Sequence, residues 1–182
     1  MAFRPDVALA DLQTVTGKGW TIEALATPGH TANHMAYAFR EADLIFSGDH
    51  VMAWSTPIVA PPDGAMSDYM ASLAKLARRS EQVYLPGHGG PVRDAPRFVQ
   101  SYIGHRKARE ASILHRLDKG AADIPTLVRA IYIGLDPRLI GAAALSLLAH
   151  LEDLAARGLV ATDVAPTIGG VYRLTEFPRP AA

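Results

Sequence analysis

Three short apolar runs in this sequence each end in a glycine-containing turn that carries a histidine or an aspartate. The turns are TPGH at residues 27–30, SGDH at 47–50 and PGHGG at 86–90. Proline and glycine interrupt helices, so each apolar run is predicted to be a β-strand that stops at its turn. We therefore expect His30, Asp49 and His88 to lie at the ends of three separate strands.

The first part of the chain predicts a small sheet and one surface helix. The predicted strands are residues 20–26, 34–39, 43–47 and the run that ends at Pro86. The second and third runs are separated only by the charged residues 40–43, which predicts a hairpin. Apolar residues at helical spacing in 66–79 predict an amphipathic helix with Ser67 as its N-cap.

After Pro91 the pattern becomes helical. Apolar side chains recur at helical spacing from Asp94 to Gly120, and two further helices are predicted, each with proline in its first turn. The stretches LVATDV and GVYRLTE predict a terminal β-hairpin. Helices followed by such a hairpin are typical of a winged-helix module. We expect one domain at residues 1–104 and a second at 105–182.

Composition restricts the chemistry that this chain can perform. Its 182 residues contain 18 Lys and Arg against 18 Asp and Glu, so no global charge favours nucleic acid or an anionic membrane. It has no cysteine, so any metal must be held by His, Asp or Glu. The N-terminus lacks a signal-peptide core and no run approaches about 20 apolar residues. A soluble, cytoplasmic protein with no membrane partner is expected.

The three predicted turns together form a candidate metal site. Imidazole and carboxylate are suitable ligands for Zn²⁺, Fe or Mn²⁺, and a site needs several of them to converge from rigid elements. His30, Asp49 and His88 are predicted to converge in this way. The remaining histidines on predicted helices are assigned no chemistry; they are His105, His115 and His150.

The motifs TPGHTANH, FSGDH and LPGHGG, in this order and with a helix between the last two, resemble the second half of the metallo-β-lactamase fold hydrolases. The resemblance covers roughly residues 7 to 104. The helical and hairpin tail resembles the C-terminal winged-helix extension of the LACTB2-like subgroup. The fold class implied is α/β, with the C-terminal half of an αββα sandwich followed by a winged-helix-like domain.

The resemblance also implies a function. In this family the histidine of the TPGH turn binds a first metal, the aspartate bridges two metals, and the histidine of the PGHG loop binds the second. These roles transfer to His30, Asp49 and His88, with two zinc ions as the implied cofactors and iron or manganese as alternatives. A hydroxide bridging the metals would attack an ester, thioester, amide or phosphodiester, with Asp49 as the catalytic residue. His34 and His50 would orient ligands or pack beside them.

One feature departs from the family pattern. The His-x-His-x-Asp-His motif, which supplies further ligands in the first half of the domain, has no counterpart here, because no histidine precedes His30. We therefore expect a truncated chain whose metal centre is under-coordinated and whose activity is impaired. A half sandwich also leaves an apolar sheet face uncovered. Homodimerisation or swapping through that face, which includes alternate residues of the 34–46 hairpin, is expected.

The sequence suggests two other interpretations. Ser47 lies two residues before Asp49, but the chain has no Gly-x-Ser-x-Gly elbow, which argues against a Ser-His-Asp hydrolase. The alternative to an enzyme is a non-catalytic binding module whose winged-helix tail docks nucleic acid or protein. Residues 105–178 carry nine Lys and Arg against eight Asp and Glu, with no evident basic recognition helix. The hydrolase interpretation is therefore preferred.

Overall fold

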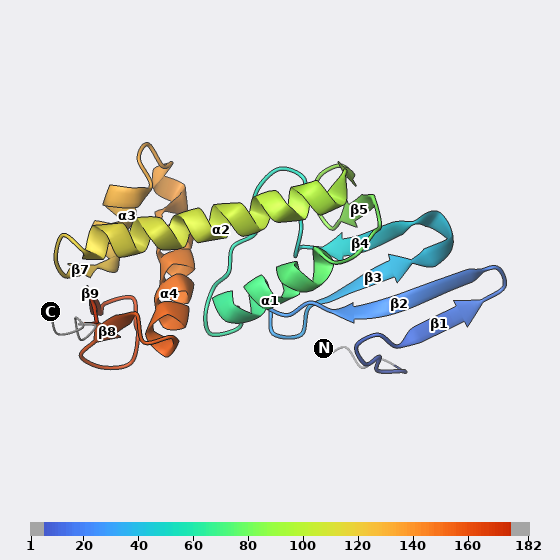
Figure 1. The fold of residues 1–182 in the computed structure, drawn as a ribbon, viewed down its shortest axis with the longest axis horizontal. Coiled ribbons are helices and arrows are strands. Elements are labelled where there is room, and N and C mark those ends of the chain that lie inside the picture. The colour runs from blue at the N-terminus through green and yellow to red at the C-terminus, as the bar shows by residue number, and fades with distance from the viewer. Residues whose placement is uncertain (1–5, 176–182) are drawn as a thin grey trace, which may run out of the picture.

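The computed structural model of the chain describes residues 6–175, in which a sheet region and a helical region are joined by one long helix (Figure 1). The sheet has six strands in the order β1-β2-β3-β4-β5-β6. All neighbours are antiparallel except β4 and β5, which are parallel. The strands are β1 Thr14–Gly17, β2 Trp20–Ala26, β3 Met35–Phe39, β4 Leu44–Gly48, β5 Val83–Pro86 and β6 Val92–Arg93.

Two helices cover one face of this sheet. Helix α1 spans Met66–Leu76 and the first part of α2, which spans Ala95–Leu117, packs beside it. Alternation along the strands turns small and branched side chains toward the helices, because successive residues of a strand point to opposite faces. The buried strand residues include Leu25, Ala36 and Ile45. Helix α1 contributes a fully buried stripe of Met66, Tyr69, Leu73 and Leu76.

The opposite face of the sheet is apolar and only partly covered. Cross-strand pairing places Tyr37 beside Phe46, and Ile22 beside Phe39. The Phe46 side chain is 40% exposed, while its neighbours on this face are half-buried. We call Ile22, Tyr37, Phe39 and Phe46 the open face.

The second region begins along the same long helix. Its elements are β7 Ala122–Asp123, α3 Ile124–Ile131, a short 3₁₀ turn at Pro137–Leu139, α4 Ile140–Ala156, β8 Val160–Thr162 and β9 Val171–Leu174. Another 3₁₀ turn, Arg40–Ala42, joins β3 to β4 in the first region. Strands β7, β9 and β8 form a three-stranded antiparallel sheet. The C-terminal end of α2 contributes Ile113 and Leu117 to this second core. The α/β half-sandwich and the winged-helix-like region are thereby confirmed.

The long helix crosses the predicted domain boundary. Ala95, Val99 and Tyr102 pack into the first core, whereas Ile113 and Leu117 pack into the second. A division after residue 104 therefore falls inside a continuous helix, and the domain boundary stays a prediction.

Local details differ from the sequence expectations at several places, including the two-residue strands β6 and β7, which were not predicted. Ala65, not Ser67, is the N-cap of α1, and it makes no side-chain cap hydrogen bond. Strand β1 was not predicted; it pairs with β2 across the Gly17–Trp20 turn. The expectation that no segment reaches membrane-spanning length is also wrong, because Pro137–Ala156 passes by length and composition. In the structure this segment packs Leu147, Leu151 and Leu154 into the second core.

Candidate functional site

The three predicted turns lie at the same edge of the sheet. Strands β4 and β5 are parallel, and β2 runs in the direction of β4 because each is antiparallel to β3. The carboxyl ends of β2, β4 and β5 therefore meet at one edge, where the turns carrying His30, Asp49 and His88 follow directly. Ligand sites in sheets of this kind form outside the carboxyl ends of the strands.

The closest approach within the predicted set is between Asp49 and His88. Nε2 of His88 lies 3.6 Å from Oδ2 of Asp49. The other carboxylate oxygen, Oδ1, is buried and has no hydrogen-bond partner. A carboxylate oxygen withdrawn from water without a partner is costly, so this oxygen is positioned to accept a cation or a donor that the chain itself does not supply.

Backbone shape at Gly87 permits this arrangement. A Cβ atom at Gly87 would lie 2.9 Å from Oδ1 of Asp49, so a larger residue would occupy the space that this oxygen faces. The N–H of Gly87 donates to the carbonyl of Gly48 at 2.9 Å, which ties the two turns together. The glycine therefore keeps the surroundings of the carboxylate open.

His30 is oriented by the backbone of a distant loop. Its Nδ1 lies 2.7 Å from the carbonyl oxygen of Ile58. Since a carbonyl can only accept, Nδ1 carries the proton and donates, which leaves the lone pair of a neutral imidazole on Nε2. This is the hydrogen-bond pattern that commonly fixes the tautomer of metal-ligating histidines.

His34 supports the Asp49 turn. The backbone N–H of Asp49 donates to Nε2 of His34 at 3.2 Å, so the other ring nitrogen carries the proton and contacts Oγ1 of Thr27 at 2.8 Å. Burial lowers the pKa of His34, and the nearby His30 lowers it further. Both nitrogens of His34 are engaged, so it acts as a positioning residue for the Asp49 turn.

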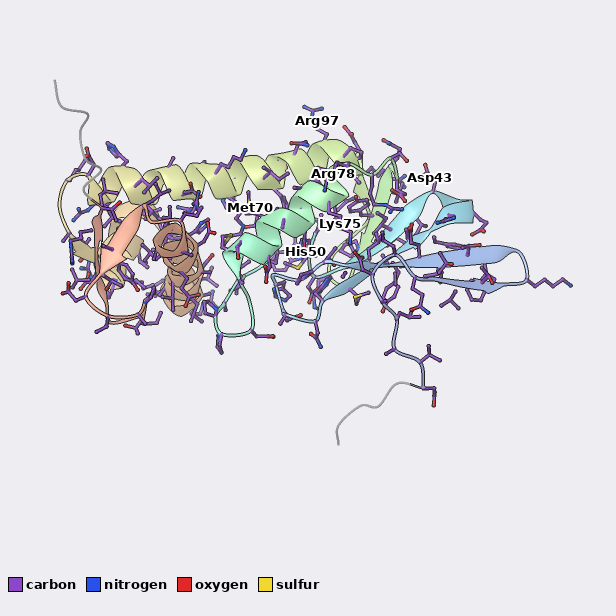
Figure 2. The ribbon with its side chains drawn as sticks, turned by 60° about the horizontal axis from the view of Figure 1, so that its bottom comes forward. Asp43, His50, Met70, Lys75, Arg78 and Arg97 are labelled. Atoms are coloured by element: carbon purple, nitrogen blue, oxygen red, sulfur yellow. The ribbon has the colours of Figure 1, made fainter. Side chains whose placement is uncertain are left out.

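His50 is a packing residue beneath helix α1 (Figure 2). Its ring lies 5.5 Å from the ring of His34 and 4.5 Å from the ring of Tyr69. The side chain is fully buried, and burial lowers its pKa to about 3, with a smaller contribution from His34. The Tyr69 hydroxyl donates to the His50 carbonyl at 3.0 Å, which anchors this turn to α1.

A complete cage is not assembled by these side chains. Within residues 6–175, no group of three or more His, Asp and Glu side chains is close enough to hold a metal ion. The structure pairs Asp49 with His88, and it places His30 at 6.4 Å from His34 between ring centroids. The set of His30, Asp49 and His88 as joint metal ligands stays a prediction.

Two other residues clarify the chemistry. The hydroxyl of Ser47 is buried and donates to the carbonyl of Val51 at 2.8 Å, so its proton is committed to the turn. Arg106, which sequence reasoning missed, is buried on α2. A signal was present: Arg106 lies four residues after Tyr102, within the apolar face of a predicted helix.

Comparisons with known proteins show which family this chain resembles. The sequence profile of the Metallo-beta-lactamase superfamily matches residues 2–88, and that of the Beta-lactamase associated winged helix domain matches residues 124–165. The Beta-lactamase-like protein 2 homolog of Drosophila melanogaster is 31% identical over 82% of this chain and 51% of its own. The Atrochrysone carboxyl ACP thioesterase of Aspergillus fumigatus is 31% identical over 69% of this chain and 42% of its own. The chain thus spans about half the length of these relatives or less.

Solved structures show the same fold. A metallo-beta-lactamase family protein from Thermus thermophilus superposes on 94% of this chain and 55% of its own, with a TM-score of 0.77 and 27% identity. A beta-lactamase domain protein from Burkholderia ambifaria superposes on 96% of this chain and 54% of its own, with a TM-score of 0.82 and 20% identity. Both superpositions include the sheet region and the helical region together.

Proposed function

Because the chain belongs to the metallo-β-lactamase superfamily and carries its associated winged-helix domain, we propose that it forms part of a metal-dependent hydrolase. The observation that carries this proposal is the buried, unpartnered Oδ1 of Asp49 beside His88. No other carboxylate oxygen in the described part of the chain is both buried and without a hydrogen-bond partner. Its position at the carboxyl edge of the sheet supports a role at the reaction centre.

The residues present supply some, but not all, of the ligands that a centre of zinc, iron or manganese ions needs. Asp49 and His88 would hold it, and His30 would join them through Nε2, the nitrogen that its contact with Ile58 leaves free. When bound, the metal supplies Lewis-acid activation of water and of the scissile group. His34 holds the Asp49 backbone and Gly87 leaves space beside its carboxylate, so the chain's own contribution is to fix that oxygen. A two-metal centre would need further donors beyond these three.

Thioesters are the substrate class that we propose first. Two similar proteins carry thioesterase in their names, the Atrochrysone carboxyl ACP thioesterase of Aspergillus fumigatus and Thioesterase pkgB of Emericella nidulans, the latter 34% identical over 58% of this chain and 30% of its own. A thioester carbonyl is also the most readily attacked of the proposed groups, which include ester, amide and phosphodiester. A partly coordinated metal site would be expected to retain activity longest on such a substrate.

The proposal is tested with zinc binding and thioester hydrolysis measured on the same protein. Asp49→Asn and His88→Ala are each expected to reduce bound zinc in equilibrium dialysis, and to reduce hydrolysis of an acyl-N-acetylcysteamine, at least about tenfold. His115→Ala and Asp43→Asn, which alter exposed residues away from the three turns, are the matched controls. If the Asp49 and His88 variants bind as much zinc as the wild type, the assignment of these residues as metal ligands is wrong. A zinc-loaded chain that hydrolyses no thioester, and instead shifts DNA in a gel, would favour a binding module.

The open face supports a proposal about assembly. Tyr37 and Phe46 are neighbours across β3 and β4, and the face also includes Ile22 and Phe39, so a second copy of the chain could cover it with the same apolar side chains. Burial of such a face stabilises association in proportion to the apolar area removed from water. We propose a homodimer or swapped assembly through this face.

A charge placed at Phe46 is expected to break that assembly. Phe46→Glu would introduce a carboxylate into the middle of the contact, and its desolvation should shift the chain to monomer at concentrations where the wild type is dimeric. Sedimentation equilibrium measures the shift. Val164→Glu, which alters an exposed apolar residue outside the open face, is the control. A wild-type chain that stays monomeric at high concentration would contradict the proposal.

A further inference from the structure

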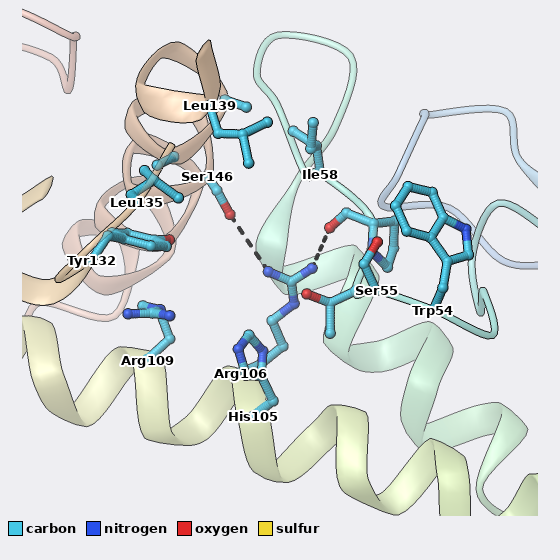
Figure 3. Close-up of a pocket in the computed structure, with 14 residues that line it drawn as sticks. Trp54, Ser55, Ile58, His105, Arg106, Arg109, Tyr132, Leu135, Leu139 and Ser146 are labelled. Carbon is cyan, nitrogen blue, oxygen red and sulfur yellow. Dashed lines mark hydrogen bonds between the residues drawn. The ribbon is translucent and has the colours of Figure 1, made fainter. Parts of the chain in front are cut away.

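A cavity lies between the two regions of the molecule, apart from the three turns (Figure 3). Its volume is about 350 Å³, and it is bounded by residues 54–58, by α2, and by the chain from Tyr132 to Ser146. Ile58, Leu135 and Leu139 supply apolar walls. The volume is at the lower end of the range for small-molecule sites.

One charged side chain lies at the centre of this cavity. Arg106 is 4% exposed; one terminal nitrogen of its guanidinium donates to the carbonyl of Pro57 and the other contacts Oγ of Ser146 at 3.5 Å. Its Nε has no hydrogen-bond partner. Arg106 forms no salt bridge with any described residue. A buried cation without a counter-charge is costly, so its surroundings favour an anion.

A second guanidinium lines the same cavity three residues later on α2. Arg109 stacks on the Tyr132 ring with its Cζ 3.9 Å from the ring centroid, and donates to the carbonyl of Ile131 at 3.4 Å. Arg109 also makes no salt bridge within residues 6–175. No Asp or Glu lines the cavity, whereas His105 does. The charge lining this apolar space is therefore positive only.

We propose that this cavity binds a small organic anion, with its carboxylate or phosphate at Arg106 and Arg109 and its apolar body against Ile58, Leu135 and Leu139. Guanidinium groups bind both anions through charge-assisted hydrogen bonds, and each terminal nitrogen of Arg106, which carries two N–H groups, makes only one contact, to Ser146 or to Pro57. The stacking of Arg109 on Tyr132 holds its charge in place without a competing carboxylate.

The cavity is linked to the three turns through one loop. Ile58 contributes its side chain to the cavity, while its carbonyl accepts the hydrogen bond from His30. An anion held at Arg106 would therefore lie beside the loop that orients His30. We assign this cavity to the anionic end of the substrate, the end that is not hydrolysed, and this assignment rests on the proposed function. Binding of an anion to the cavity does not itself depend on hydrolysis.

Binding is measured by the fluorescence of Trp54, which lies at the cavity rim and is 70% exposed. A Trp20→Phe background leaves Trp54 as the reporter, because the chain has two tryptophans. Octanoate and octyl phosphate are titrated as the two anionic probes and octanol as their neutral counterpart. We expect at least one anion to bind at least tenfold more tightly than octanol, and the better of the two identifies the anionic group. Equal binding of octanol would overturn the proposal.

Substitutions in the cavity test whether the anionic probes bind there. Arg109→Met, whose side chain is only half-buried, and Arg106→Met should each weaken binding of the preferred anion at least tenfold with little effect on octanol. Lys107→Met removes an equal charge from the exposed side of α2 and should leave binding unchanged. Ala142→Phe, which keeps both charges but fills the cavity, should weaken all three probes. Anion binding that persists in folded Arg109→Met protein would overturn the assignment, even if Arg106→Met fails to fold.

Discussion

Replacement of Gly29 by alanine is expected to destabilise the folded chain by about 4 kcal/mol, because two costs add at this position. Gly29 has φ of +129°, a conformation that L-residues rarely adopt. A Cβ atom there would also lie 2.3 Å from the backbone N and Cα of Tyr69, in the helix that closes the core. Backbone atoms of a packed helix cannot move aside as a flexible side chain can, so α1 would have to shift.

Urea unfolding of Gly29→Ala and Gly19→Ala measures this effect. Gly19 also has positive φ, +78°, but no atom lies within 4 Å of its added Cβ. Its substitution should therefore cost only the conformational strain, about 1 kcal/mol. Equal destabilisation by the two alanines would show that the contact between the Gly29 turn and α1 is not as tight as described. Loss of zinc binding in Gly29→Ala, beyond what its unfolded fraction explains, would link this turn to the site.

Acid is expected to destabilise the second core through His150. This side chain on α4 is 1% exposed and neither ring nitrogen has a hydrogen-bond partner. Burial, with smaller contributions from the positive charges of Arg106 and Arg109, lowers its pKa from 6.5 to about 3. The unfolded chain therefore binds a proton that the folded chain does not, so stability falls as pH decreases from about 6.5 toward 3. At pH 4 the loss from this group is about 3 kcal/mol.

His150→Leu should remove that loss. The variant replaces an imidazole with two unsatisfied nitrogens by an apolar side chain of similar size, so it should be more stable than wild type at pH 7 by about 1 kcal/mol. At pH 4 the difference should grow by about 3 kcal/mol. Chemical denaturation at the two pH values measures both, with His115→Leu as the control that removes an imidazole from the exposed side of α2. A pH-independent difference would contradict the neutral buried state of His150.

Most of the secondary structure could be predicted from the sequence. A run of apolar and β-tolerant residues that ends in a turn placed β2 at its observed bounds, Trp20–Ala26, and helical spacing placed α1 and α2 to within a few residues. The spacing of apolar residues and the positions of turn-forming residues are local properties of the sequence, so they can be recognised without knowing the fold. Strand β1 was missed because TVTG lacks a strong apolar pattern and is exposed throughout. Its pairing with β2 depends on a tertiary neighbour.

The candidate site was predicted in part. The turn motifs identified His30, Asp49 and His88, because glycine and proline at strand ends are visible in the sequence. The 3.6 Å approach of His88 to Asp49 and the unpartnered Oδ1 depend on the parallel pairing of β4 with β5, which sequence reasoning did not predict.

The cavity lined by Arg106 and Arg109 was not predicted from the sequence. Arg106 and Arg109 look like ordinary charges on a long helix, and only the tertiary packing around the cavity buries Arg106 and half-buries Arg109. The same applies to His150, which sequence reasoning placed on a helix without assigning it to surface or core.

The amino-acid sequence by itself determined the family, the order of the longer strands and helices, and the residue types that could bind a metal, because motifs and periodicity are local properties of the chain. Only the tertiary structure decided which of those side chains approach one another and which charges lose contact with water. Both outcomes depend on contacts between residues far apart in sequence, such as Pro57 with Arg106 and His30 with Ile58. Burial of charge, which gives the cavity its proposed specificity for anions, is a consequence of packing alone.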